Sequence, residues 1–188
     1  WPSAWPFQTP STLSLMPNLR TSSRSTGTAT WSSTTPTRMN ASEIERILRR
    51  KCRRVFLGVY AKDRLPDLLL SKRPLLLVYN TYPHHRPGEH WVVLYIGRNG
   101  RGEYFDSFGR PPDRLFRLYL DKYCAKWKQN RRQIQSALTR FCGHYCVFYC
   151  LFKCLNYDMN TIVSCFSNDT ALNDWIVHRF VCNSINWF

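Results

Sequence analysis

The segment CGHYCVFYCLFKC, residues 142–154, sets the strongest condition on how this chain folds. Apolar residues occupy nearly every side of a helix drawn through it, so other parts of the chain have to cover that helix all round. The polar stretch before it, QNRRQIQSALTR at 129–140, predicts a loop. We therefore expect a buried helix that begins at Cys142 and ends near Leu155.

Short apolar runs earlier in the chain predict the strands that would cover this helix. They are VFLGVY, PLLLVYN and the two arms of a hairpin with the turn GRNGRG, at residues 55–60, 74–80, 90–96 and 103–106. Helices are expected before and after these strands. The pattern indicates the α+β class, with one mixed central sheet packed on the buried helix.

Three further helices complete this expectation. The first begins at a capping box formed by Ser42 and Glu45. The second runs over about 111–126, and the third over 170–183 with Asp169 as its cap. The apolar faces expected on these helices comprise Ile44, Ile47 and Leu48; Leu115, Leu118, Tyr119 and Tyr123; and Trp175, Ile176 and Phe180.

The first 38 residues differ from the rest of the chain. Ser, Thr and Pro fill 22 of these 38 positions, and no acidic residue occurs among them. Such a composition has no helix or strand period and predicts a disordered segment. Met39 would be a natural start, so residues 1–38 are a candidate for a translated upstream region rather than native protein. Residues 39–188 are expected to form one domain with its own core.

The chain carries a formal net charge of +15, which favours anionic partners such as nucleic acid. No run of 18 uncharged apolar residues and no secretory signal is recognisable, so we expect neither a membrane span nor export. Eight cysteines in such a chain favour a reduced, intracellular setting. The densest group of cations, and the candidate DNA-binding surface, is Arg46, Arg49, Arg50, Lys51, Arg53 and Arg54.

Cys142 is the residue best placed for chemistry. Free N–H groups at a helix N-terminus stabilise a thiolate and can also stabilise an oxyanion. A cysteine nucleophile needs a nearby base, usually His, and a third group that orients the imidazole. His90 and Asp106 stand at the outer ends of the two hairpin strands, where strand pairing could bring them together. Gln135, seven residues before Cys142, carries an amide that could donate to an oxyanion.

Other interpretations of these residues compete. The cysteines at 142, 146, 150 and 154 recur every four residues, but roughly 18 Å of helix separates the first from the last, too far for one tetrahedral zinc ion. Two of them with His144 could still bind a metal, although buried cysteine more commonly fills core space, and no metal is expected. A non-catalytic nucleic-acid-binding protein would also account for the charge, with aromatic side chains stacking on bases.

The order and spacing of these residues resemble the adenovirus-type cysteine endopeptidases (adenain). The similar segments are FLGVYAKDRLP at 56–66, NTYPHHRPGEHW at 80–91, EYFDSFG at 103–109, and the stretch from Gln135 to Cys142-Gly143. Together they lie within 56–150, half of the chain. The resemblance extends to adenain-like proteases of Maverick/Polinton-type transposons and large DNA viruses. More distantly it extends to the SUMO-specific proteases, which share the fold.

The resemblance implies a role for each of the four residues. His90 would be the general base, Asp106 the group that orients it, Cys142 the nucleophile and Gln135 the oxyanion donor. Adenovirus enzymes carry Glu where this chain has Asp106, and both acids can hold an imidazole. Gln133 is a rival for Gln135, but its nine-residue offset from Cys142 fits less well.

The resemblance also implies partners. Protein substrates would be virion or mobile-element precursors, cleaved after small, often glycine-containing sites by a monomeric, nuclear or virion-associated enzyme. No cofactor would be required, but DNA and a disulfide-linked activating peptide could stimulate activity, with Cys124 at a similar offset to the peptide-linked cysteine. A SUMO- or ubiquitin-like deconjugating protease is the alternative within this fold. An inactive remnant of a mobile element is a further one.

Overall fold

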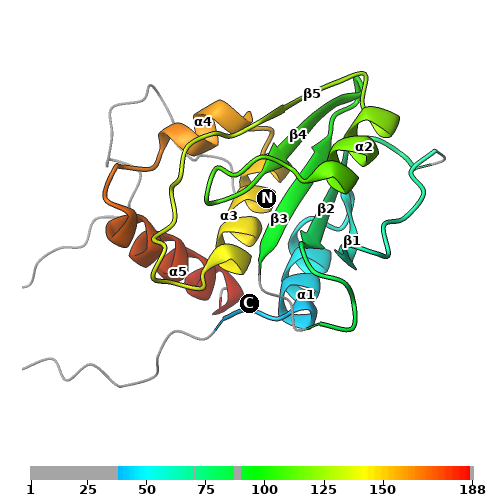
Figure 1. The fold of residues 1–188 in the computed structure, drawn as a ribbon. Helices are drawn as coiled ribbons and strands as arrows, with labels where there is room; N and C mark the ends of the chain where they lie inside the picture. The colour runs from blue at the N-terminus through cyan, green and yellow to red at the C-terminus, as the bar shows by residue number, and fades with distance from the viewer. Residues whose placement is uncertain (1–37, 70, 87–89, 187–188) are drawn as a thin grey trace, which may run out of the picture. The chain divides into compact units, whose positions relative to one another are not determined.

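The computed structural model describes residues 38–69, 71–86 and 90–186, so residues 1–37 of the segment expected to be disordered lie outside the described residues. Figure 1 shows the arrangement of the helices and strands within these ranges. In chain order they are α1 (Ala41–Lys51), β1 (Phe56–Ala61), β2 (Leu75–Asn80), β3 (Trp91–Ile96), β4 (Arg101–Phe105), α2 (Arg114–Tyr123), β5 (Lys126–Gln129), α3 (Cys142–Cys154), α4 (Met159–Ser164) and α5 (Thr170–Asn186).

The five strands make one mixed sheet in the order β1-β2-β3-β4-β5, so every strand pairs with its neighbour in sequence. β2, β3 and β4 are antiparallel, whereas β1 and β5 join the two edges in parallel. Side chains alternate between the faces, as the two-residue period of a strand requires. In β2, for example, Leu76 and Val78 point to one side and Leu77 and Tyr79 to the other.

Helices cover both faces of this sheet (Figure 1). One face packs against α3, with α1 and α5 on the far sides of that helix, and the other face packs against α2. Every residue of α3 from Cys142 to Cys150 is buried, because the sheet and two helices surround this part of the helix. The structure therefore confirms the α+β fold with a mixed sheet on a buried helix that begins at Cys142.

The capping box of α1 lies two residues earlier than predicted. Asn40 is the N-cap and accepts from the Glu43 N–H (3.0 Å), while the Glu43 carboxylate accepts from the Asn40 N–H (2.8 Å). Glu45 instead accepts from the Val59 N–H at 2.8 Å, which ties α1 to β1. The predicted apolar face of α1 is buried as expected.

The second helix ends at Tyr123, three residues before the predicted end, and residues 126–129 form the edge strand β5. The four-residue strand KWKQ is half exposed and mostly polar, so no hydrophobic run marked it. The buried face of α2 is Phe116, Leu120 and Tyr123. Leu118 is 60% exposed, so the predicted face was wrong by about one residue because Phe116 turns toward the sheet.

Two features of the C-terminal region also differ from expectation. The short helix α4 had no prediction, and Trp175 of α5 is 43% exposed rather than inward. The polar residues Asn173 and Asp174 take the inward face, because both make hydrogen bonds inside the domain. Asp169 does cap α5, as predicted, accepting from two backbone N–H groups. Among the described residues, no helix combines the length and apolar character needed to cross a membrane.

Candidate active site

The β3–β4 hairpin brings His90 and Asp106 together. His90 directly precedes β3 and Asp106 directly follows β4, and the antiparallel register places these strand ends side by side. The His90 Nε2 atom lies 3.0 Å from the Asp106 Oδ1 atom, with both side chains largely buried. The ring N–H does not point squarely at the carboxylate, so the contact is an ion pair rather than a well-angled hydrogen bond. Such bonds commonly tighten when substrate binds.

A reciprocal pair of hydrogen bonds holds the Asp106 backbone. The Asp106 N–H donates to Asn130 Oδ1 (2.9 Å), and Asn130 Nδ2 donates back to the Asp106 carbonyl (2.7 Å). The Asp106 carboxylate also accepts from the Phe108 N–H at 2.7 Å, which fixes its rotamer. Asp106 therefore shapes the turn after β4 and, at the same time, lies beside His90.

The turn after Asp106 needs a glycine at its end. Gly109 has φ +68°, a left-handed conformation that residues with a side chain rarely adopt. A Cβ atom there would also lie 2.7 Å from the Arg132 carbonyl carbon. The turn consequently packs directly on the backbone of the 130–135 loop, and this loop carries Gln135.

Gln135 is fully buried and is held at both ends of its amide. Its Oε1 atom accepts from the Ser107 hydroxyl (2.7 Å), and its Nε2 atom donates to the Thr139 carbonyl (3.0 Å). The same nitrogen also donates to the Thr139 hydroxyl over a longer distance of 3.4 Å. The rival Gln133 is exposed, and its amide donates to the Gln135 carbonyl at 3.0 Å. Ser107 thus links the turn at Asp106 to the glutamine beside the pocket.

Cys142 is the first residue of α3, as the sequence predicted. The N-cap, Phe141, provides no side-chain hydrogen bond, so the helix presents its first N–H groups without a side-chain acceptor. Gly143 packs closely against two buried side chains. A Cβ atom at this position would lie 2.9 Å from Met39 Cβ and 3.4 Å from Trp91 Cδ1. This close approach positions the helix start directly behind the first residue of β3.

The protonation of His90 reflects these neighbours. Burial lowers the pKa of the imidazole, but contact with the Asp106 carboxylate and the Cys142 thiol raises it further, to about 9. The folded protein therefore favours a protonated ring at neutral pH. An imidazolium next to a cysteine is the arrangement that supports a nucleophilic thiolate.

All four predicted residues line one pocket of about 330 Å³. His90 and Asp106 come from the hairpin, Gln135 from the loop and Cys142 from α3, so three separate segments converge on it. The remaining lining is aromatic, polar and basic: Thr81, Tyr82, Tyr104, Phe108, Arg110, Pro111, Asp113, Phe116, Thr139 and Arg140. The arrangement contains a thiol, a base, a carboxylate and hydrogen-bond donors around an open cavity.

The other predicted site residues lie elsewhere. Cys124 is the C-cap of α2, not part of the helix, and burial raises the pKa of its thiol to about 11. A Cβ at Gly102 would be 2.5 Å from the Cys124 sulfur, so this thiol packs against the sheet. The six basic residues of the candidate DNA-binding surface lie on α1 and just after it, and the described lining of the pocket does not include them.

Sequence reasoning missed the residues that support the site. Asn130 and Ser107 make no recognisable motif, because their contacts depend on how the 130–135 loop folds back on the turn at Asp106. The signal that could have found Ser107 is its place directly after the acid, where a strand has just ended. Asn130 carried no such signal, since it stands within an ordinary polar loop.

Several solved structures have folds similar to that of this chain. The ASFV (African swine fever virus) protease superposes with a TM-score of 0.55 at 20% identity, covering 77% of this chain and 67% of that chain. A selenomethionine structure of the same protease gives 0.43 at 24% identity, covering 57% and 45%. ChlaDub1 from Chlamydia trachomatis gives 0.45 at 16% identity, covering 60% and 59%. Neither protein-family profiles nor curated proteins match the sequence.

The superposition with a TM-score of 0.55 supports the fold that the sequence predicted, which this chain shares with the ASFV protease. At identities below 25% these comparisons concern the fold alone. In the selenomethionine structure the match spans 45% of the ASFV protease chain, less than half of its length. The chemistry of the site accordingly rests on the geometry of its own residues.

Proposed function

We propose that this protein is a cysteine protease in which Cys142 is the nucleophile and His90 the general base. The observation that carries the proposal is the convergence of Cys142, at the start of a buried helix, with the His90–Asp106 pair on one pocket. These are the three groups that nucleophilic cysteine catalysis needs. Gln135 in the same pocket supplies an amide donor.

The reaction follows from these positions. The Cys142 thiolate attacks the carbonyl carbon of a peptide bond, and the carbonyl electron pair moves to the oxygen. The Cys142 N–H donates to this oxyanion. Gln135 Nε2 donates to it as well, exchanging its long contact with the Thr139 hydroxyl (3.4 Å) for the oxyanion. Protonated His90 gives its proton to the departing amine as the C–N bond breaks. Water then loses a proton to His90 and attacks the thioester, which releases the acid and restores the thiolate.

Asp106 acts through His90 in this scheme. Its carboxylate stabilises the imidazolium and holds the ring nitrogen Nε2, which leaves Nδ1 for the thiol. The reciprocal bonds with Asn130 hold the Asp106 backbone, and the bond donated by the Phe108 N–H fixes its carboxylate before substrate arrives. Preorganisation of this kind lowers the cost of aligning the groups during reaction.

The finer proposal follows the resemblance to adenain. We propose an endopeptidase that cleaves virion or mobile-element precursor proteins, intracellularly and without a metal, with DNA bound by the basic residues of α1 as an activator. Activation by a disulfide-linked peptide at Cys124 would require local opening beside β4, since that thiol is buried. A deconjugating protease remains the alternative, and substrate probes distinguish the two.

The decisive experiment is covalent labelling of the full chain with two electrophilic probes. One is a short peptide ending in glycine with a Michael acceptor in place of the scissile carbonyl, and the other is ubiquitin or SUMO with the same electrophile at its C-terminus. We expect the peptide probe to modify Cys142 and the modification to disappear in His90→Ala. Mass spectrometry identifies the labelled residue.

The exposed thiol of Cys165 serves as an internal control. Two results would contradict the proposed protease activity: equal modification of Cys142 and Cys165, or labelling of Cys142 that persists in His90→Ala. Either would show that His90 does not raise the reactivity of the Cys142 thiol. Rapid reaction with only the ubiquitin or SUMO probe would replace the endopeptidase with a deconjugase. DNA binding without any selective labelling would favour the non-catalytic alternative.

DNA binding is tested separately by titrating a short duplex at several salt concentrations. We expect the logarithm of the affinity to fall steeply with the logarithm of salt, because phosphate contacts release counterions. Replacing Arg46, Arg53 and Arg54 with Gln should reduce that slope by about one for each phosphate that the variant no longer neutralises. A salt-independent affinity would contradict an electrostatic DNA site on α1.

A further inference from the structure

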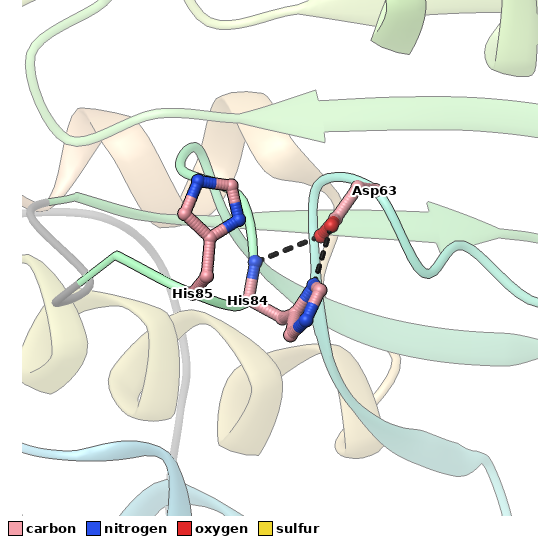
Figure 2. A group of neighbouring side chains, drawn as sticks. All are labelled: Asp63, His84 and His85. Atoms are coloured by element: carbon pink, nitrogen blue, oxygen red, sulfur yellow. Dashed lines mark hydrogen bonds and ion pairs between the residues drawn. The ribbon is translucent and has the colours of Figure 1, made fainter.

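A second cluster of reactive side chains lies outside the pocket, where the chain leaves two neighbouring strands. β1 and β2 are parallel, so the segments that follow them emerge at the same edge of the sheet. Asp63 belongs to the turn after β1, and His84 and His85 belong to the loop after β2. Figure 2 shows the three side chains together, and one ligand atom from each lies within 4.8 Å of the others.

Asp63 and His84 already form a tight pair. The His84 N–H donates to Asp63 Oδ1 (2.8 Å), and His84 Nδ1 lies 2.6 Å from Asp63 Oδ2. A carboxylate that accepts these contacts carries its negative charge at neutral pH, as Asp ordinarily does. The neighbouring cation Lys62 is paired with Asp113 on the opposite side of the turn. The Asp63 carboxylate is therefore a local anion in a strongly basic chain.

The His85 side chain is not held by hydrogen bonds within the described part of the chain. Its exposed ring meets the His84 ring edge-on, with centroids 5.5 Å apart and planes at 89°, and it makes no hydrogen bond within the described residues. In Figure 2 one ring nitrogen of His85 is turned toward the side on which the Asp63 carboxylate lies. Two imidazoles and one carboxylate thus converge on one small, solvent-accessible region.

We propose that Asp63, His84 and His85 bind one divalent transition-metal ion of the Zn²⁺ type. Imidazole and carboxylate are ligands that such ions accept, at about 2.0–2.2 Å, with water filling the remaining positions. Donors around a tetrahedral ion lie about 3.4 Å apart, and exposed side chains can close this distance by rotation. The ion replaces the proton shared by His84 and Asp63, which leaves to solvent.

The site joins two segments, and one of them borders the pocket. The loop that carries His84 and His85 begins at Thr81 and Tyr82, which line the pocket, and it leads to His90. The backbone already connects the two segments once, through the Lys62 N–H and the Tyr82 carbonyl at 3.2 Å. A bound ion adds a second connection and stabilises the folded state in proportion to its occupancy. This inference does not depend on the proposed protease activity.

The test uses the full chain carrying Cys142→Ser, so that metal cannot bind the thiol beside His90. Isothermal titration with zinc chloride should give one ion per chain, and excess Zn²⁺ at about 100 times the Kd should raise Tm by roughly 5 °C or more. Cobalt chloride provides a spectroscopic probe. We expect cobalt ligand-field absorption without a thiolate-to-metal charge-transfer band, since the ligands are nitrogen and oxygen.

Variants locate the site. His85→Ala should weaken zinc binding at least tenfold with little change in the metal-free Tm, because this exposed ring makes no hydrogen bond within the described residues and touches only the His84 ring. Asp63→Asn should do the same while keeping an oxygen for the His84 N–H. His178→Ala is the matched control. His178 Nε2 lies 3.5 Å from the Cys182 sulfur, so these two residues are another pair that could bind zinc. Absence of zinc binding, unchanged affinity in His85→Ala and Asp63→Asn, or loss of binding in His178→Ala would overturn the proposal.

Discussion

Two buried acid–base pairs lie on strand β4 and directly after it, and they differ in whether the protein satisfies all of their polar atoms. Glu103 pairs with Lys153 Nζ at 2.8 Å and also accepts from the Tyr149 hydroxyl at 2.5 Å. Asp106, just beyond the end of the same strand, pairs with His90, whose Nδ1 atom has no hydrogen-bond partner among the described residues. The first pair is complete within the protein. The second leaves a ring nitrogen without a hydrogen-bond partner, in a residue that lines the pocket.

The two pairs also lie at opposite ends of α3, and the cysteines of that helix follow the same division. Cys142 lines the pocket beside His90, whereas Cys146 and Cys150 are fully enclosed and burial raises the pKa of both thiols well above the usual range. All three residues repeat at the same four-residue spacing. The surroundings of these thiols therefore differ although their spacing does not, and the proposed nucleophile is the one beside His90.

Removal of the two thiols should give the largest contrast between the ends of the helix. Cys142→Ala should reduce kcat/KM for a cleavable peptide by at least about 10³-fold, which corresponds to about 4 kcal/mol of lost transition-state stabilisation. Cys146→Ala removes only core volume and should keep kcat/KM within about threefold while lowering the free energy of unfolding by about 1 kcal/mol. Comparable losses of activity in both variants would erase the distinction.

The pH dependence of stability should reveal the incomplete pair. Because Asp106 and Cys142 raise the folded-state pKa of His90 from 6.5 to about 9, the folded protein holds a proton that the unfolded chain has released. This stabilisation is fully present below pH 6.5 and is lost as pH rises through 9. Its full size is about 3 kcal/mol. Urea unfolding at pH 6.5, 7.5 and 8.5 measures the decline.

His90→Gln is the control for this measurement, since buried cysteines also lose stability once the unfolded thiols ionise. The decline between pH 6.5 and 8.5 should be smaller in the variant. Below pH 6.5 a second effect has the opposite sign, because burial and the nearby His178 lower the pKa of His144 to about 4. Folding thus excludes a proton there, and stability should fall toward pH 4. If the unchanged protein and His90→Gln lost stability identically above pH 6.5, the decline could not be attributed to His90.

The two glutamines of the loop provide a smaller contrast. Gln135→Ala removes the proposed oxyanion donor and should lower kcat about 10²-fold with little change in KM. Gln133→Ala changes an exposed side chain outside the described pocket lining and should leave kcat within about twofold. If Gln133→Ala proves the more damaging substitution, the alternative offset considered from the sequence would be the better assignment.

The smallest effect is expected at the enclosed end of α3. Cys150→Ser places a hydroxyl at a position with no solvent access, so the free energy of unfolding should fall by about 2 kcal/mol while kcat stays unchanged. Denaturant melts and peptide cleavage by the same preparation compare both quantities. A loss of kcat with unaltered stability would give Cys150 a role in catalysis. It would contradict the contrast drawn between Cys142 at the pocket and the enclosed cysteines of α3.

Local patterns were sufficient for the parts of the site that depend on one element. The hairpin placed His90 and Asp106 at adjacent strand ends, and the apolar run placed Cys142 at a helix start. Contacts between distant segments were not predictable in this way. The inward face of α5 is polar because Asp174 accepts from the Tyr145 hydroxyl, and β5 forms only because β4 offers it an open edge.

The sequence-ordered sheet has a consequence for the time at which the pocket forms. Since β2, β3 and β4 pair only with adjacent strands, they need short loop closures and can assemble early. Synthesis also completes this meander before α3 has been made. The imidazole and its carboxylate can thus be aligned in a nascent chain that still lacks α3. Docking of that helix is the step that brings the Cys142 thiol to them and completes the proposed site.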